Sequence, residues 1–228
     1  MVHCTGFENQ RPQGLREFKS HPFRNMKKIK FIYFDLGGVI VDHISGLIKT
    51  AEKFNLDKVE VISLFKKHAN DLDRGLLSLG ELEEIFDKKF DISNKLDKKL
   101  GEFIVDNFKI IQETHDLIYE IANDISIGIL SNVSEDIFNY VEKNKLIPSV
   151  AYDSLIVSAK LKVIKPEKKI FDIALSKSKY SLEEVLFIDD KLENIDAAKS
   201  LGWKTVLFET NNPQKSVNEI KRVIGLDI

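Results

Sequence analysis

Residues 29–34 form an apolar run, rich in aromatic and branched side chains, that ends abruptly in Asp35, Leu36 and two glycines. This pattern favours a buried strand of a parallel sheet that carries a polar group to its carboxyl edge, where open α/β sheets bind their ligands. Gly37 and Gly38 have no Cβ, so the backbone can turn sharply and its N–H groups can approach a bound anion. The stretch therefore predicts a chemical centre at Asp35, although an acid followed by glycine is also typical of a simple turn.

Predicted strands and helices alternate in the second half of the chain. Short apolar segments with polar ends lie at residues 125–131, 153–158, 185–190 and 204–208. Between them, apolar residues recur at helical spacing. Strands that alternate with helices predict an α/β fold with a doubly wound parallel sheet and right-handed crossovers.

A helical module interrupts this pattern after the first strand. Residues 44–122 carry apolar positions at helical spacing, and the Ser-Leu-Gly-Glu sequence at 78–81 has the form of a capping box. We therefore expect an α/β core made of residues 26–43 and 123–228, with the helical module inserted between them. Residues 1–25 show no periodicity and are interpreted as a disordered extension or tag.

The composition is that of an ordinary globular protein: of 228 residues, 43% are hydrophobic and 31% are charged. The 34 basic and 36 acidic residues give a net charge of −2, which argues against nucleic acid or a polybasic membrane surface as a partner. No apolar run approaches the roughly 20 residues of a membrane span, and no basic-then-apolar secretory pattern opens the chain. The single Cys4 cannot form an internal disulfide, which fits a reducing compartment, so we expect a cytoplasmic protein.

The polar residues at the predicted strand ends come from distant parts of the sequence. All carboxyl ends of a parallel sheet lie on one edge, so Asp35, Ser131, Lys165, Asp189 and Asp190 should converge. Adjacent carboxylates repel and raise one another's pKa values unless a cation lies between them. Mg²⁺ prefers oxygen ligands and usually keeps waters and a substrate phosphate. With a lysine and a hydroxyl opposite, the sequence predicts a magnesium and phosphate site.

Four segments around these residues resemble the four motifs of the haloacid dehalogenase-like (HAD-like) hydrolase superfamily, in the family's order. They are Phe-Asp-Leu-Gly-Gly-Val at 34–39, Leu-Ser-Asn at 130–132, Lys-Pro-Glu-Lys-Lys-Ile-Phe at 165–171 and Phe-Ile-Asp-Asp-Lys-Leu-Glu-Asn at 187–194. The resemblance extends over residues 29–210. The chain is similar to the subfamily I phosphatases, which carry a helical cap after the first motif, and to glucose-1-phosphatase-like members that share the Asp-Leu-Gly start.

The resemblance implies a Rossmann-like core with an inserted helical cap, dependence on Mg²⁺, and hydrolysis of a small phosphorylated metabolite through an aspartyl-phosphate. Asp35 would be the nucleophile. Its carboxylate, the carbonyl of Gly37 and the carboxylate of Asp189 would bind the metal, and Asp190 would hold a metal-bound water. We expect a monomer or a homodimer.

The same resemblance assigns the phosphate contacts. Ser131 and the amide of Asn132 would hold phosphate oxygens, together with the backbone at Gly37. Lys165 would neutralise both Asp35 and the phosphate. Two anions do not approach each other unaided, so the metal and Lys165 are needed to bring Asp35 in line with phosphorus.

One position departs from the family pattern. HAD-like phosphatases usually carry a second aspartate two residues after the nucleophile, which protonates the leaving oxygen, and here that position is Gly37. General acid–base catalysis contributes about 10²–10⁴-fold. The chain would therefore prefer sugar 1-phosphates or other activated phosphates, or would be a phosphate-binding scaffold with little turnover. Asp42 is a candidate replacement acid, with helix capping as the alternative. Haloacid dehalogenation is disfavoured, because those enzymes need no metal and the acid pair would have no purpose.

The helical module contains further polar residues. His68, Asp71, Asp73 and His115 match no metal-ligand spacing and are interpreted as solvated or capping residues. Arg74 is a candidate partner for a second anionic group of the substrate, with surface solvation as the alternative. These side chains do not specify a substrate.

Overall fold

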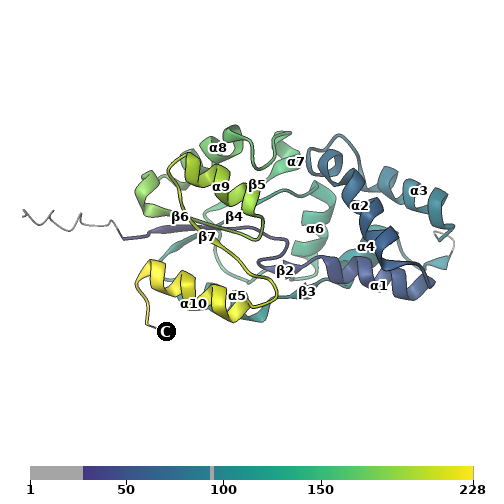
Figure 1. Ribbon diagram of the computed structural model, residues 1–228, viewed down its shortest axis with the longest axis horizontal. Coiled ribbons are helices and arrows are strands. Elements are labelled where there is room, and N and C mark those ends of the chain that lie inside the picture. Colours follow the sequence, from purple (N-terminus) through teal and green to yellow (C-terminus); the bar gives the residue numbers. More distant parts are fainter. Residues whose placement is uncertain (1–27, 93–94, 228) are drawn as a thin grey trace, which may run out of the picture.

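The computed structural model describes residues 28–92 and 95–227, and the extension expected at residues 1–25 lies outside these ranges. The centre of the protein is a sheet of five parallel strands (Figure 1). In spatial order they are β5 (Ser154–Val157), β4 (Ser126–Ser131), β1 (Phe31–Phe34), β6 (Val185–Asp189) and β7 (Lys204–Leu207). The chain adds strands on one side of β1 and then crosses to the other, so the strand order reverses at β1. The expected doubly wound parallel sheet is confirmed.

The two faces of β1 belong to two different parts of the core. Successive side chains of a strand point to opposite faces, and Ile32 and Phe34 pack in one hydrophobic cluster whereas Phe31 and Tyr33 pack in another. All four side chains are fully buried. A strand with apolar residues on both faces is stable only at the centre of a covered sheet, and this places its carboxyl end at the middle of the sheet edge.

Helices cover both faces of the sheet (Figure 1). The face that Phe31 packs on is covered by α8 (Lys168–Ser178) and α9 (Leu192–Ser200). The opposite face is covered by α5 (Gln112–Ile121), α6 (Glu135–Lys143) and α10 (Pro213–Ile224). The short helix α7 (Ser158–Leu161) follows β5, and the 3₁₀ helix η2 (Leu182–Glu184) precedes β6.

The inserted module lies at one end of the molecule (Figure 1). Its helices are α1 (Ile44–Phe54), α2 (Lys58–Asp73), α3 (Leu79–Phe90) and α4 (Leu100–Asp106). The chain enters it through β2 (Val41–Asp42) and leaves through β3 (Lys109–Ile110), which pair as an antiparallel ladder. The range 44–122 expected for the module also includes α5, but α5 packs beside α10 over the sheet. We therefore propose that the core resumes at Gln112. Across the described ranges, none of the helices has the length and apolar character that crossing a bilayer requires.

The capping box expected at residues 78–81 is confirmed at the start of α3. Ser78 Oγ accepts a hydrogen bond from Glu81 N at 3.2 Å, and the Glu81 carboxylate accepts one from Ser78 N at 2.8 Å. These two bonds satisfy backbone donors that the first turn of a helix leaves unpaired.

Replacing Ser78 by alanine should therefore lower the free energy of unfolding by about 1 kcal/mol, because one capping acceptor is lost. Urea denaturation followed by circular dichroism measures the change. Ser63→Ala is the matched control, since Ser63 is exposed inside α2 and caps no helix. A loss at Ser78 no larger than the loss at Ser63 would contradict the assigned role of the cap.

Candidate active site

Three carboxylates converge at the carboxyl edge of the sheet. Asp35 directly follows β1, Asp189 is the last residue of the neighbouring β6, and Asp190 follows it. The strands run in register, with Phe34 opposite Ile188 and Asp35 N donating to Ile188 O at 2.9 Å. Each acid offers one oxygen, and these oxygens lie within 4.8 Å of one another. The structure thus brings together the acids whose convergence follows from their positions at strand ends.

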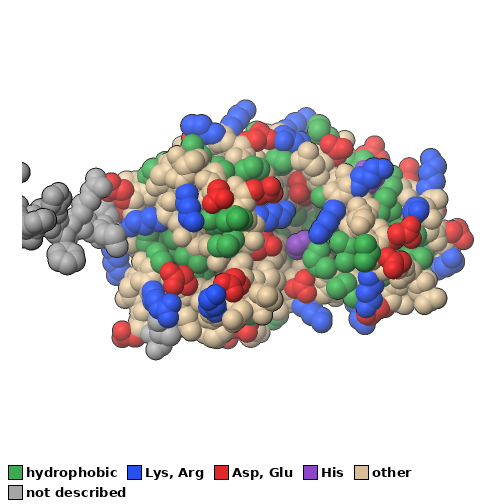
Figure 2. Space-filling model, in the orientation of Figure 1, with side chains coloured by type: hydrophobic (Ala, Val, Ile, Leu, Met, Phe, Trp, Pro, Cys, Tyr) green, Lys and Arg blue, Asp and Glu red, His purple; other side chains and the backbone are tan. Residues whose placement is uncertain are grey.

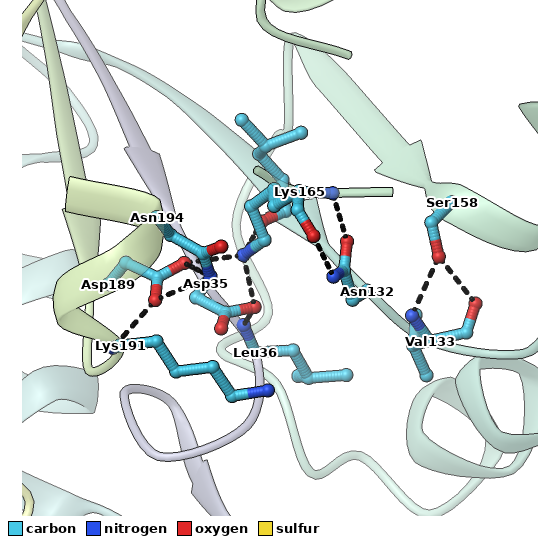
Figure 3. Close-up of polar contacts among 10 residues, drawn as sticks. Asp35, Leu36, Asn132, Val133, Ser158, Lys165, Asp189, Lys191 and Asn194 are labelled. Atoms are coloured by element: carbon cyan, nitrogen blue, oxygen red, sulfur yellow. Dashed lines mark hydrogen bonds and ion pairs between the residues drawn. The ribbon is translucent and has the colours of Figure 1, made fainter. Parts of the chain in front are cut away.

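Lys165 lies against two of these acids and is enclosed by protein (Figure 3). Its Nζ lies 3.0 Å from Asp35 Oδ1 and 2.6 Å from Asp189 Oδ2, and it donates to Leu130 O at 2.8 Å. Burial by itself would lower the pKa of Lys165, but the two carboxylates outweigh burial and the pKa is raised. The buried ammonium therefore stays charged at neutral pH and supplies a positive charge to the acid cluster.

The backbone around Lys165 is fixed by Asn132 (Figure 3). Lys165 N donates to Asn132 Oδ1 at 2.7 Å, and Asn132 Nδ2 donates to Lys165 O at 2.8 Å. Next along the chain, Val133 N donates to Ser158 Oγ at 2.9 Å. Ser131 is the last residue of β4, and it lies buried at the carboxyl edge of the sheet. Because the Asn132 side chain is engaged with Lys165, its backbone amide is the group left for a phosphate contact.

The two adjacent acids differ in their hydrogen bonding. Both oxygens of Asp189 accept from Asn194 Nδ2 at 3.0 Å, one also accepts from Lys191 N at 2.8 Å, and the other accepts from Lys165. Burial raises the pKa of Asp189, against the opposing effect of Lys165. Asp190 Oδ1 is buried without a hydrogen-bond partner among the described residues, and burial together with the neighbouring acids raises the pKa of Asp190 to about 7. A cation with oxygen ligands fits this donor set, because it would stabilise the ionised acids.

Two glycines allow the loop after β1 to approach the other groups closely. Gly38 has a φ of +82°, and a Cβ there would lie 2.4 Å from Asp190 Oδ2. A Cβ on Gly37 would lie 2.8 Å from His43 Nδ1. The loop therefore requires small residues at both positions. Gly38 is needed for the turn, and both glycines are needed for the close approach to Asp190 and His43.

A cavity of about 260 Å³ lies between the core and the helical module. Its core wall includes Asp35, Ser131 and Lys165, and its module wall includes Lys66 and Asp73. Figure 2 shows a hollow between the two lobes with basic, acidic and histidine side chains around it. Cavities of a few hundred Å³ hold small molecules, so the site is suited to a small metabolite.

His43 follows β2 and lines the same cavity. Its Nδ1 is buried and, within the part of the chain that the structure describes, has no hydrogen-bond partner. Burial lowers the pKa of His43 to about 4, with a further contribution from Lys191, so the imidazole is uncharged at neutral pH. Sequence reasoning missed this residue, because no motif or spacing distinguishes it.

A known protein family matches most of the chain, including the strands and acids of this site. The family model described as haloacid dehalogenase-like hydrolase matches residues 32–208. The chain belongs to this family. One relative, the D-ribitol-5-phosphate phosphatase of Bacteroides thetaiotaomicron, is 29% identical over 203 residues, which are 81% of this chain and 93% of that protein. Bifunctional epoxide hydrolase 2 of Mus musculus is 34% identical over 74 residues, which are 32% of this chain and 13% of that protein.

Solved HAD-like structures share the fold. A predicted HAD-like hydrolase from Porphyromonas gingivalis has a TM-score of 0.66 at 23% identity, covering 88% of this chain and 100% of the other. A HAD-family enzyme from Bacteroides thetaiotaomicron, solved in complex with magnesium and inorganic phosphate, has a TM-score of 0.58 at 22% identity, covering 80% and 95%. The α/β core of this protein is therefore the Rossmann-like core of the HAD-like fold.

Two residues of the module region differ from the expectation that they are solvated or cap helices. His115 is buried in α5, and burial lowers its pKa. Asp73 lines the cavity, and burial raises its pKa to about 7. The expectation was wrong for both, because α5 packs beside α10 over the sheet and α2 ends against the core. His68 is half-buried, and Asp71 is exposed.

Asp42 and Arg74 contact protein groups. Asp42 Oδ1 accepts from Ile44 N at 3.1 Å and from Ser45 N at 3.3 Å, so this carboxylate caps α1, as the alternative reading has it. Arg74, at the end of α2, forms an ion pair with Glu167, which precedes α8. Arg74 therefore joins the module to the HAD-like core, and its contact with a second anionic group of the substrate stays a prediction.

Proposed function

We propose that the protein is a magnesium-dependent phosphatase that hydrolyses a small phosphorylated sugar or sugar alcohol through an aspartyl-phosphate on Asp35. The observation that carries this proposal is the buried ion pair of Lys165 with Asp35, beside the acids Asp189 and Asp190 at the edge of a cavity. The family, and a relative that is a phosphatase of D-ribitol 5-phosphate, support a phosphate monoester hydrolase. The structure of a family member with magnesium and phosphate supports the metal.

The metal would be held by the Asp35 carboxylate, the Gly37 carbonyl and the acid pair. Within that pair, the hydrogen bonds favour Asp190 as the direct ligand, because its Oδ1 has no partner in the part of the chain that the structure describes, whereas both oxygens of Asp189 accept from protein donors. The family resemblance alone implies the reverse, with Asp189 as the metal ligand and Asp190 holding a metal-bound water. When bound, Mg²⁺ would neutralise charge on the phosphoryl group and orient it.

The hydrogen bonds of Asp35 favour one of its oxygens as the nucleophile. Oδ1 accepts from Leu36 N at 2.7 Å and lies 3.0 Å from Lys165 Nζ, so Oδ2 is the oxygen left to attack phosphorus. Ser131, the Asn132 amide and Lys165 would hold the phosphate oxygens and absorb their charge. The covalent intermediate divides one difficult displacement into two easier ones, and water then releases phosphate from Asp35.

The leaving group decides between two kinds of substrate. When a sugar 1-phosphate is hydrolysed, the sugar departs through its weakly basic anomeric oxygen. This is the substrate we expect if no group replaces the carboxyl missing at Gly37. When a sugar alcohol 5-phosphate, the class named for the relative, is hydrolysed, the sugar alcohol departs through a basic alkyl oxygen. That oxygen needs a hydrogen-bond or proton donor. If neither is turned over, the chain is a phosphate-binding scaffold.

We expect inorganic phosphate release from p-nitrophenyl phosphate to require Mg²⁺, because the acid cluster cannot accept a dianion without a cation. Treatment with EDTA should lower the rate of phosphate release about 10²-fold or more, and added Mg²⁺ should restore that rate. A panel with glucose 1-phosphate, ribitol 5-phosphate and glycerol phosphate then identifies the substrate class.

Two controls make this result specific. Circular dichroism before and after EDTA shows whether the fold survives metal removal. Chloride release from 2-chloropropionate tests the family's dehalogenase activity. Undiminished turnover in EDTA, chloride release without metal, or absence of any phosphate release would each overturn the proposed function.

A further inference from the structure

The His43 ring occupies the space that a side chain on residue 37 would fill. A Cβ built on Gly37 would lie 2.8 Å from His43 Nδ1 and 3.2 Å from Cε1. The oxygen of an aspartate lies two bonds beyond its Cβ, so a carboxyl on residue 37 would overlap the imidazole. The chain therefore has a histidine nitrogen near the place where the family's usual acid would put a polar atom.

This nitrogen is unpaired within the described ranges of the chain. Nδ1 is buried and lacks a hydrogen bond among the described residues, although the ring lines the cavity that contains Asp35, Ser131 and Lys165. An unsatisfied buried polar group costs free energy, so its persistence calls for an explanation. An occupant of the cavity with an oxygen at this position would satisfy it.

The ring is held in place by its surroundings. His43 lies between β2 and α1, and its ring meets Phe108 edge-on, with centroids 6.4 Å apart and an interplanar angle of 78°. The adjacent Asp42 is fixed by its bonds to the start of α1. Nδ1 is buried in this structure, so its contact with a bound ester requires a small shift of the ring or of the loop at Gly37.

We propose that His43 donates a hydrogen bond from Nδ1 to the bridging oxygen of the bound phosphate ester, and so takes over the leaving-group contact of the carboxyl missing at residue 37. This inference rests on the proposed phosphatase function. It assigns His43 a contact with the substrate, and it extends the substrate class to alkyl esters such as sugar alcohol phosphates. A donor at the bridging oxygen matters most where the departing oxygen is strongly basic.

The test compares two substrates that differ in the basicity of the leaving oxygen. His43→Leu removes the donor with little change in volume, and should lower kcat about 10²-fold on an alkyl ester such as ribitol 5-phosphate but only about threefold on p-nitrophenyl phosphate. His43→Asn, which places an amide donor near the position of Nδ1, should recover most of the activity on the alkyl ester. Gly37→Asp with His43→Ala should recover it by restoring the carboxyl.

The outcomes separate this contact from a structural role and from failure of the proposed function. Equal losses on both substrates, or no loss on the alkyl ester, would overturn the role of His43. Wild-type protein that hydrolyses p-nitrophenyl phosphate but no alkyl ester would also overturn it, while leaving the phosphatase function intact. Wild-type protein that releases no phosphate at all would overturn both. Thermal midpoints of the variants identify misfolding, and the double variant provides a second reading if His43→Leu does not fold.

Discussion

Replacing Asp35 by asparagine should abolish phosphate release, with a fall in kcat/KM of about 10³-fold or more. The amide lacks the nucleophilic oxygen, so no aspartyl-phosphate can form. The fold should remain, because Lys165 keeps Asp189 as its charged partner at 2.6 Å and an asparagine oxygen can still accept from Leu36 N, as Asp35 Oδ1 does at 2.7 Å. Phosphate release measures the activity, and mass spectrometry after an acid quench detects the phosphorylated intermediate in wild type.

Asp196→Asn is the matched control for this variant. Asp196 is exposed on α9, so the substitution removes the same charge without touching the acid cluster. It should leave turnover unchanged. Phosphate release by Asp35→Asn at the wild-type rate would mean that the nucleophile lies elsewhere, and the mechanism proposed for this site would be wrong.

The acid cluster could be predicted from sequence because the fold itself gathers it. Asp35 and Asp189 end neighbouring parallel strands, and the pairing of Phe34 with Ile188 leaves no freedom in how far apart these ends lie. Strand identity follows from the apolar runs, and one shared edge follows from parallel topology. The capping box at residues 78–81 was equally predictable, because it depends only on local sequence.

The module side of the cavity could not be predicted in this way. Asp73 reaches the cavity because α2 ends against the core, where Ser158 Oγ donates to Asp73 O at 2.5 Å and Arg74 pairs with Glu167. These contacts join residues about 85 to 93 positions apart. Hydrophobic periodicity describes the inward face of a helix, but it does not say where that helix docks. His43 was missed because no motif or spacing distinguishes it.

The difference between Asp189 and Asp190 also lies beyond sequence. A pair of adjacent acids at a strand end predicts a cation site, but it does not say which carboxylate the protein itself saturates. Asn194 decides this, because α9 returns its amide to Asp189 with both bonds at 3.0 Å. The metal role proposed for Asp190 follows from that hydrogen bonding.

Lys165→Met should both destabilise the protein and stop turnover. Lys165 is buried against Asp35 and Asp189, and removing one partner of a buried ion pair costs about 3–5 kcal/mol, because charges remain without compensation. Without the ammonium, which lowers the pKa of Asp189 against the effect of burial, the folded-state pKa of Asp189 rises further above its unfolded value. The native state then binds more protons than the unfolded state, so the stability of the variant should improve as pH falls and worsen as pH rises. Urea denaturation at several pH values measures this.

Two variants separate the buried charge from general effects of losing a lysine. Lys168→Met removes an exposed lysine whose partner Asp172 is also exposed, and should change stability by less than about 1 kcal/mol. Lys165→Met combined with Asp189→Asn removes a positive and a negative charge together, and should regain much of the stability but none of the activity, because the phosphate would still lack its ammonium. If Lys165→Met alone were as stable as wild type at neutral pH, the ion pair would not be what holds Asp35 and Asp189 together.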